Sequence, residues 1–520
     1  MGAARDGTTD CVRTATIIGV EAKPVTVEVS FTNGLPGISI VGMPDTAVCE
    51  ARLRVRAALR ACGFDVPNVN ILVNLAPSDI PKNGSGFDLP IALGILLATG
   101  QISGGDIAGR LCVGELSLDG SVRAVRGMLA YAQLARELDL GMLSALVEGG
   151  VPTTSLNRHS CVRSLRDVCT STYIKPQPAQ VPAHGTAKDY CDIAGNVLAK
   201  RALTIAAAGE HALMMIGPPG SGKTMLASRL PTIMATLNEE ERFAAAMIHS
   251  VAGLPYDSIL SGQKPFRAPH HSATRAGLMG GGSPVVPGEV SLAHNGILFL
   301  DEISEFGSAI LQLLRQPVES GYISLARARG TTVLPASFML VAASNPCPCG
   351  YFGDPERSCT CSDAEIRKYQ GRIGGPLLDR IDMVIDVWRS KPGEVLATGS
   401  GTSSAHMREQ VAQAQEFARW RGVEHAHTTD TPAPVPRGVD GAKLSGEGAR
   451  LLSACGLGQS ERACFEDAAE RLRLSGRGIM RALSVARTIA DLEQSERVVT
   501  EHLLEALTFR ADGRCGNGSS

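Results

Sequence analysis

A glycine-rich stretch that follows an apolar run constrains the fold more than any other part of the chain. From Met215 to Leu226 it reads MIGPPGSGKTML, which contains every position of the pattern G-x-x-x-x-G-K-[ST]. Such a loop turns its backbone N–H groups toward phosphates, while Lys223 reaches the β- and γ-phosphates and the Thr224 hydroxyl faces Mg²⁺. A Gly/Pro loop that matches by accident is disfavoured, because strand, loop and helix come in the required order. The expected nucleotide-binding residues are Gly217, Pro218, Pro219, Gly220, Ser221, Gly222, Lys223 and Thr224.

A second apolar run supplies the carboxylates that a triphosphate with Mg²⁺ requires. Gly296–Leu300 has the pattern of a buried strand, and Asp301 and Glu302 follow it directly. Asp301 suits the outer shell of the metal, and Glu302 suits polarising the attacking water. An apolar run that ends in two acids is common by itself. Paired with the glycine-rich loop, it predicts an α/β ATPase core that uses ATP and Mg²⁺.

Length and composition limit the other classes. A chain of 520 residues is too long for one core and predicts about three domains. The formal net charge of −2 gives no global nucleic-acid footprint, and the 4% content of aromatic residues disfavours base stacking as the main binding device. Any basic binding surface is therefore expected to be local.

Neither export nor membrane insertion is expected. The start, Met1–Arg13, lacks the apolar core of a signal peptide, and the longest apolar run, Leu89–Thr99, is too short to cross a bilayer. These features predict a cytoplasmic protein without a membrane partner. In that compartment the 14 cysteines are expected to be free thiols or metal ligands rather than disulfides.

Two basic segments of the core are candidates for contact with DNA. The first is a large loop rich in Gly and Pro, between the two halves of the nucleotide site. The second is the tip of a hairpin whose strands are expected at Tyr322–Leu325 and Thr331–Pro335. The alternatives are an ordered surface loop with capping histidines and a solvated tip. The candidate residues are Arg267, His270, His271 and Arg275 in the loop, and Arg327 and Arg329 at the tip.

A polar residue and four cysteines follow the strand expected at Phe338–Ser344. Asn345 suits a sensor that touches the γ-phosphate or the attacking water. The cysteines form two close pairs, and four thiolates satisfy tetrahedral Zn²⁺, although C-x-C is tighter than the usual knuckle. The alternative is four reduced thiols on a loop. The proposed ligands of a structural zinc are Cys347, Cys349, Cys359 and Cys361.

Two arginines further along the chain are candidates for completing the site. Arg380 follows a helix and precedes a strand, which places it to reach the γ-phosphate of a neighbouring subunit. The alternative is a local ion pair with Asp379 or Asp382. Arg477 begins the central helix of the last domain and is the candidate for a second sensor over the nucleotide, with Arg481 as runner-up.

Part of the N-terminal region resembles the proteolytic domain of Lon-type proteases. The resemblance rests on PKNGSGFD at 81–88 and GELSLDGSVR at 114–123. Gly86 stands at the nucleophile position, with Ser85 one residue early, and no lysine occurs between Lys82 and Lys175. A Ser-Lys dyad needs both groups within hydrogen-bond reach, so we expect this fold without peptidase activity.

The motifs GPPGSGKT, FRAPHHS, PGEVSLAHNGILFLDE, NPCPCG and LLDRID together resemble the ComM/YifB family of Mg-chelatase-related AAA+ ATPases. The resemblance implies a P-loop AAA+ core of α/β class, an N-terminal Lon-protease-like domain of S5-type α+β fold and a C-terminal helical lid. It also implies a ring, expected to be hexameric, in which Lys223, Thr224, Asp301, Glu302, Asn345, Arg380 and Arg477 match Walker, sensor and finger positions. The expected parts are a flexible start at 1–11, the Lon-like domain at 12–175, a linker at 176–188, the ATPase core at 189–390, a linker with a helix at 391–441, the lid at 442–510 and a disordered tail at 511–520.

The resemblance implies a motor that drives branch migration or helicase-type remodelling of branched or single-stranded DNA in recombination and DNA uptake. Recombination proteins are the expected partners. The alternative is a chaperone-like, protein-remodelling or Mg-chelatase-type motor that uses the same loops. One departure concerns Asn196, which stands where related proteins carry Gln and which we expect near the adenine.

Overall fold

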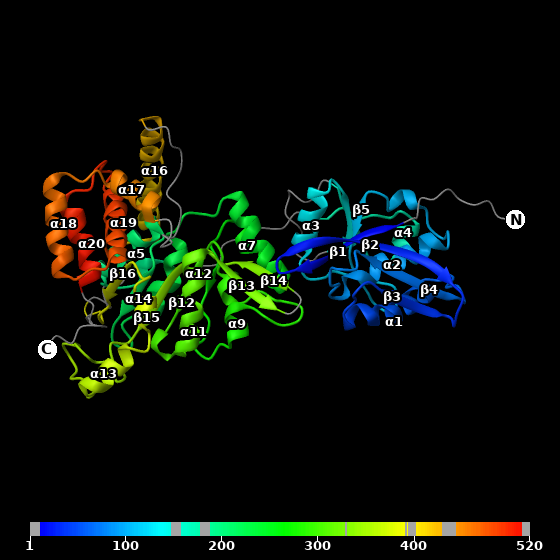
Figure 1. Ribbon diagram of the computed structural model, residues 1–520, viewed down its shortest axis with the longest axis horizontal. Coiled ribbons are helices and arrows are strands. Elements are labelled where there is room, and N and C mark those ends of the chain that lie inside the picture. The colour runs from blue at the N-terminus through cyan, green and yellow to red at the C-terminus, as the bar shows by residue number, and fades with distance from the viewer. Residues whose placement is uncertain are drawn as a thin grey trace.

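The computed structural model describes residues 11–146, 158–176, 188–327, 330–390, 393, 402–428 and 444–511. The molecule is elongated, with a mixed sheet at one end, a bundle of helices at the other and a parallel sheet between them (Figure 1). This arrangement confirms the predicted α/β class with a helical C-terminal region. The predicted linker at 176–188 and the two termini lie largely outside the described residues, and the predicted linker at 391–441 is described at 393 and 402–428.

The N-terminal part is built on a seven-stranded sheet of order β3-β4-β2-β1-β5-β8-β9. Helix α2 is almost wholly buried against it, and a Cβ on Gly94 would lie 2.9 Å from Val29 Cγ2, so only glycine permits this approach. The strands are β1 (Val12–Ile18), β2 (Glu21–Thr32), β3 (Gly37–Val41), β4 (Asn70–Ala76), β5 (Arg110–Cys112), β8 (Gly141–Ala145) and β9 (His159–Val162), with the small ribbon β6 (Glu115–Leu116) and β7 (Val122–Arg123). The helices are α1 (Thr46–Ala61), α2 (Asp88–Ala98), α3 (Met128–Glu137) and α4 (Leu165–Cys169).

The central part is a five-stranded sheet of order β11-β12-β15-β10-β16, and every pair in it is parallel. Because the strands are parallel, the segments that follow β10, β12 and β15 lie together at the carboxyl ends of the strands. The strands are β10 (Leu213–Ile216), β11 (Phe266–Arg267), β12 (Ile297–Leu300), β15 (Met339–Ser344) and β16 (Met383–Asp386). The helices are α5 (Val197–Gly209), α6 (Lys223–Arg229), α7 (Glu239–Ala252), α8 (Asp257–Leu260), α9 (Arg275–Met279), α10 (Glu289–Leu292), α13 (Asp363–Gln370) and α14 (Gly375–Leu378).

The sequence after Glu302 predicts one helix at Ser308–Glu319, but the structure has two, α11 (Ser308–Leu313) and α12 (Arg315–Ser320). Pro317 accounts for the break, since it has no N–H to donate to the carbonyl four residues earlier and its ring crowds that carbonyl. The hairpin that follows has strands β13 (Tyr322–Arg327) and β14 (Gly330–Pro335), so β13 is two residues longer than predicted. Arg329 lies outside the described residues.

The N-terminal and central parts meet through α3 and α7. Gly127 N donates to Ser250 O at 2.9 Å, and the side chains of Met128 and Val251 belong to one apolar cluster. Leu129 packs with Leu237 and Ala245 in a second cluster. The two parts therefore share buried apolar surface in addition to the chain that connects them.

The C-terminal helices pack on α5 and share the apolar core of the central sheet. They are α16 (Ser404–Thr428), α17 (Leu444–Cys455), α18 (Gln459–Arg471), α19 (Gly476–Leu492) and α20 (Thr500–Ala511). In the described part of the chain, none of the helices has the length and apolar character needed to cross a membrane.

Candidate functional site

The glycine-rich loop follows β10 and turns into α6. Gly220 and Gly222 have φ of +79° and +88°, which is the left-handed region that favours glycine. Gly217 is required for a different reason, because a Cβ there would lie 2.0 Å from Val387 O. The glycines thus permit both the turn of the loop and its close packing on the end of β16.

Lys223 is buried at the start of α6, and its ammonium group lies inside the loop. Nζ donates to Gly217 O at 2.8 Å, to Pro218 O at 3.0 Å and to Asn345 Oδ1 at 3.3 Å. Burial lowers the pKa of Lys223 to about 8, against the opposing effect of the Asp301 and Glu302 carboxylates. The structure therefore brings together the predicted phosphate-binding lysine and the predicted sensor.

One short hydrogen bond joins the start of α6 to the residue that follows β12. Thr224 Oγ1 donates to Asp301 Oδ2 at 2.6 Å, and Asp301 Oδ1 accepts from the Glu302 N–H at 3.0 Å. A hydroxyl and a carboxylate are oxygen donors of the kind that Mg²⁺ binds, so this pair fits the metal. When bound, Mg²⁺ neutralises phosphate charge. Glu302, with φ of +49° and an exposed side chain, stands next to this pair.

Arg380 and Arg477 lie together near the amino ends of the strands, at the opposite end of the sheet from the glycine-rich loop. Leu213 pairs with Met383 and the Ala212 N–H donates to Asp382, so the residues before β16 lie where β10 begins, whereas the glycine-rich loop lies where β10 ends. Both arginines contact the carboxylate of Glu319, Arg477 at 3.4 Å. Arg481 forms an ion pair with Asp382 at the same end of the sheet. Arg477 is thus placed beside Arg380.

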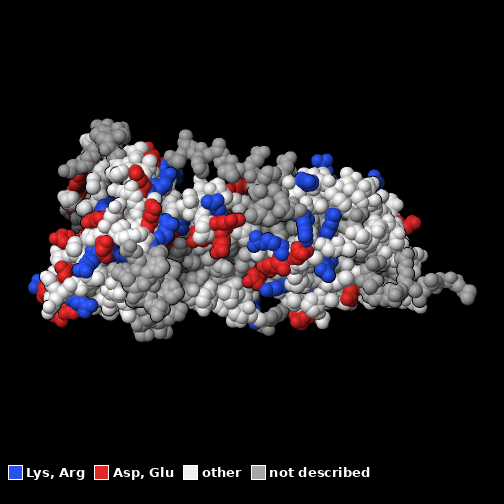
Figure 2. Space-filling model, turned by 90° about the horizontal axis from the view of Figure 1, so that it is seen from above, with Lys and Arg blue, Asp and Glu red and all other residues white. Residues whose placement is uncertain are grey.

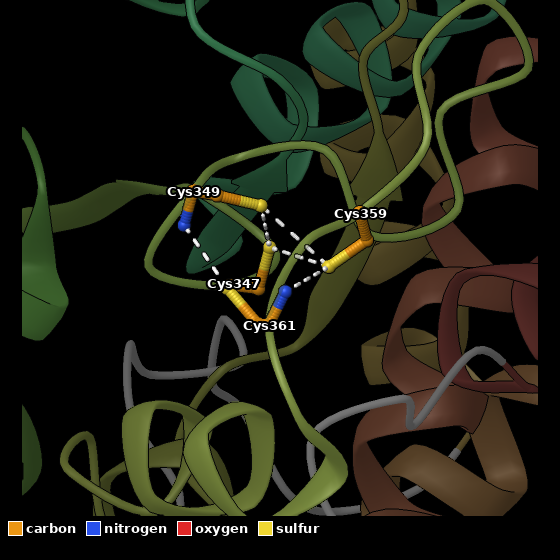
Figure 3. A group of neighbouring side chains, drawn as sticks. All are labelled: Cys347, Cys349, Cys359 and Cys361. Carbon is orange, nitrogen blue, oxygen red and sulfur yellow. Dashed lines mark hydrogen bonds between the residues drawn. The ribbon is translucent and has the colours of Figure 1, made fainter.

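Four cysteines gather in the segment between β15 and α13. Their sulfurs all lie within 4.8 Å of one another, and the Sγ–Sγ distances from Cys347 to Cys349 and from Cys349 to Cys359 are 3.4 and 3.5 Å. Figure 3 shows the side chains converging on one point, with backbone N–H groups directed at Cys359 and Cys361. Zn–S bonds of about 2.3 Å in a tetrahedron place sulfurs about 3.8 Å apart, so the donor set fits Zn²⁺.

The candidate DNA-binding residues lie on neighbouring loops, and several are engaged within the chain. Arg267 forms a two-bond ion pair with Glu289, at 2.6 and 2.7 Å. The rings of His270 and His271 are 4.0 Å apart, and Arg327 donates to Gly282 O. Arg275 is exposed at the start of α9.

In the segment that resembles Lon-type proteases, Ser85 and the nearby Lys82 make separate contacts. The Ser85 hydroxyl is hydrogen-bonded to Glu115, and the Lys82 ammonium donates to Pro77 O from a fully buried position. Burial lowers the pKa of Lys82. Ser85 is thus paired with a carboxylate, and Lys82 with a backbone carbonyl.

Some contacts at the site had no signal in the sequence. Glu319, which holds the two arginines, and Arg389, which donates to Pro219 O at 3.3 Å, were missed because both act across the fold rather than within a motif. Asn196, expected near the adenine, donates to Ser390 Oγ at 3.1 Å.

Comparisons with known proteins agree over most of the chain. Residues 189–395 match the family described as "Magnesium chelatase, subunit ChlI", residues 27–144 match "Subunit ChlI of Mg-chelatase", and residues 401–510 match its C-terminal family. The chain is 39% identical to the uncharacterized protein YifB of Salmonella typhimurium over 97% of each chain. It is 40% identical to the competence protein ComM of Haemophilus influenzae, over 95% of this chain and 96% of that one. An uncharacterized protein of Mycobacterium tuberculosis is 38% identical over 95% of this chain and 97% of its own. The chain belongs to the ComM/YifB family of Mg-chelatase-related AAA+ proteins.

Proposed function

We propose that this protein is an ATP-hydrolysing ring motor that remodels branched or single-stranded DNA, by branch migration or helicase-type action on recombination intermediates. The ATPase assignment rests on two contacts at the carboxyl ends of the parallel strands. Lys223 contacts Asn345 there, and Thr224 contacts Asp301. In this arrangement Glu302 orients and deprotonates the attacking water, and Asn345 holds the water or the γ-phosphate.

The ring is proposed from the position of Arg380. Its side chain lies near the amino end of β16, whereas the phosphate loop of the same chain follows the carboxyl end of β10. These two ends of the sheet are separated by a strand of four residues, which spans about 13 Å. An arginine there completes a site only in a neighbouring subunit, where its charge stabilises the transferring phosphoryl group. Membership of an AAA+ family, whose members assemble into oligomers, supports this reading, and we propose a hexamer.

DNA as the substrate is proposed from the relation to ComM and from the basic residues near β13 and β14. Figure 2 shows acidic and basic side chains mixed on the face seen from above, so the described residues of this face form no broad basic surface. Contact with DNA would therefore be made by local residues that ring assembly brings together. The candidates remain Arg267, His270, His271, Arg275, Arg327 and Arg329.

We also propose that Cys347, Cys349, Cys359 and Cys361 hold Zn²⁺, because their sulfurs converge at distances close to those of a tetrahedral site. The protein would act in the cytoplasm with recombination proteins, as the competence role in the name of ComM suggests. The predicted domain bounds are part of the same proposal.

A branch-migration assay tests this function. Purified protein is mixed with a Holliday junction whose homologous arms carry a fluorophore and a quencher, with ATP, and Glu302→Gln serves as the blank. We expect dissociation of the junction by the unchanged protein only. If ATP is hydrolysed and neither junctions nor forked or single-stranded DNA are bound or remodelled at low salt, the DNA assignment is wrong and a protein-remodelling motor takes its place.

A further inference from the structure

The segment that carries the four cysteines has few other means of holding its shape. Between β15, which ends at Ser344, and α13, which begins at Asp363, the described chain contains neither helix nor strand. Cys347 is fully buried, and its sulfur accepts from the Phe352 N–H at 3.3 Å. A metal held by four sulfurs would therefore fix the path of this segment. Its first ligand is only two residues from the sensor Asn345.

The same segment packs directly on the phosphate loop. Gly350, between Cys349 and Tyr351, has φ of +85°, and a Cβ there would lie 2.6 Å from Pro219 Cδ. The backbone of Gly350 thus rests against the Pro219 ring. A shift of the segment in either direction would crowd this ring or leave it without support.

A second contact reaches Pro219 through Arg389. Nε and Nη2 of Arg389 both donate to Pro219 O at 3.3 Å, and the guanidinium lies 5.4 Å from the centre of the Tyr351 ring. Nη1 lies 3.9 Å from Asp354 Oδ2, an oxygen that is buried and has no hydrogen-bond partner among the described residues. Burying a carboxylate is costly without a nearby cation, so Asp354 and Tyr351 together hold Arg389 in place.

We propose that the cysteine segment is a metal-dependent support of the nucleotide site: zinc bound by the four thiolates holds Gly350, Tyr351 and Asp354 where they position Pro219 and Asn345. This inference rests on the proposed ATP and zinc sites and adds that metal occupancy sets the affinity for ATP. Arg389 acts through Pro219 and is a positioning residue. Loss of zinc would loosen the phosphate loop while leaving Lys223, Thr224 and Asp301 unchanged.

The test combines zinc content with nucleotide affinity in the full-length protein. Zinc per chain is measured by elemental analysis, Kd with a fluorescent ATP analogue, and KM and kcat by phosphate release. We expect Arg389→Gln to keep its zinc and to raise Kd and KM by about tenfold, the effect of losing a charged hydrogen bond. Gly350→Ala should also keep its zinc and raise both values, because the added Cβ would press on the Pro219 ring. Arg357→Gln is the matched control, because Arg357 also lies over the Tyr351 ring, at 5.3 Å, and donates to Tyr351 Oη rather than to the loop. It should keep the original values.

Metal removal completes the test. We expect Cys359→Ser to lose zinc and to bind ATP at least about tenfold more weakly, while Cys464→Ser on α18 keeps both properties. Retained folding is checked by circular dichroism. Zinc-free, folded Cys359→Ser with unchanged Kd, or unchanged Kd in both Arg389→Gln and Gly350→Ala, would overturn the inference and leave the ATPase proposal intact. Absence of zinc from the unchanged protein would overturn the inference together with the zinc assignment, and failure to bind ATP at all would instead refute the proposed function.

Discussion

Arg380 forms an ion pair with Glu319 of its own chain near the amino ends of the strands, at the opposite end of the sheet from the loop that contains Lys223. Burial lowers the pKa of Arg380, with the Glu319 carboxylate opposing that effect, and Arg477 shares the same carboxylate. Two arginines therefore share one carboxylate. We propose that both arginines lie at the interface with the next subunit, where they would face the triphosphate of that subunit.

Subunit mixing tests this assignment. Arg380→Ala should lower kcat by about 1,000-fold or more, the range for a finger arginine, and change the Kd for ATP little. Lys223→Ala should abolish ATP binding. Mixed before assembly, the two inactive variants should recover measurable ATPase activity, because the intact Arg380 of one chain faces the intact loop of the other. No recovery in rings shown to contain both chains would contradict action between subunits.

Glu302 is expected to act on water rather than on binding. Glu302→Gln keeps the shape of the side chain and removes the base, so kcat should fall at least about 100-fold while the Kd for ATP stays within about threefold. Phosphate release and equilibrium binding measure the two effects. Glu305→Gln is the control, since Glu305 is also exposed and is paired with Arg372 at 3.4 Å. Equal losses in both variants would point to a shared structural effect.

The pKa of Lys223 predicts how ATP affinity depends on pH. In the free protein its ammonium group loses its proton above about pH 8. Bound phosphates stabilise the ammonium form, so the pKa in the complex is higher and binding takes up a proton between the two values. Affinity should therefore fall by up to about tenfold per pH unit above pH 8. Lys223→Arg should bind more weakly without this slope, because guanidinium stays protonated; an equal slope in both proteins would exclude Lys223 as its source.

The exposed arginine of α9 is expected to contact DNA phosphate. Arg275→Ala should weaken DNA binding for all sequences, reduce the slope of log K against log salt by about one, and leave ATPase activity without DNA unchanged. Fluorescence anisotropy at several salt concentrations measures the slope. Arg471→Ala, an exposed arginine paired with Asp467 on α18, is the control. The same slope for the original protein and Arg275→Ala would remove Arg275 from the interface.

The sequence was informative where function requires neighbouring residues or a fixed strand end. The loop from Gly217 to Thr224 is a local motif, and Asp301 is predictable because parallel strands end at the same edge. The apolar pattern of residues 46–61 predicts a helix, and α1 spans the same residues, Thr46–Ala61. The helix predicted at Ser308–Glu319 is instead two helices, although Pro317 was a readable signal for the break.

Contacts between distant segments were beyond prediction from spacing. Glu319 meets Arg380 and Arg477 because α12, the end of α14 and the start of α19 pack together, and nothing in any one segment specifies that docking. Arg389 reaches Pro219 only because Gly217 packs on the end of β16. The convergence of the four sulfurs was foreseeable from their paired spacing, whereas their position against the phosphate loop was not.

The most direct measurement is the ATPase rate with and without Holliday-junction DNA at about 50 and 200 mM salt, with Glu302→Gln as the blank. A motor that holds DNA through phosphate contacts should be stimulated strongly at low salt and much less at the higher concentration. A steady ATPase rate that no DNA structure changes at either salt concentration would contradict the account of this protein as a DNA motor.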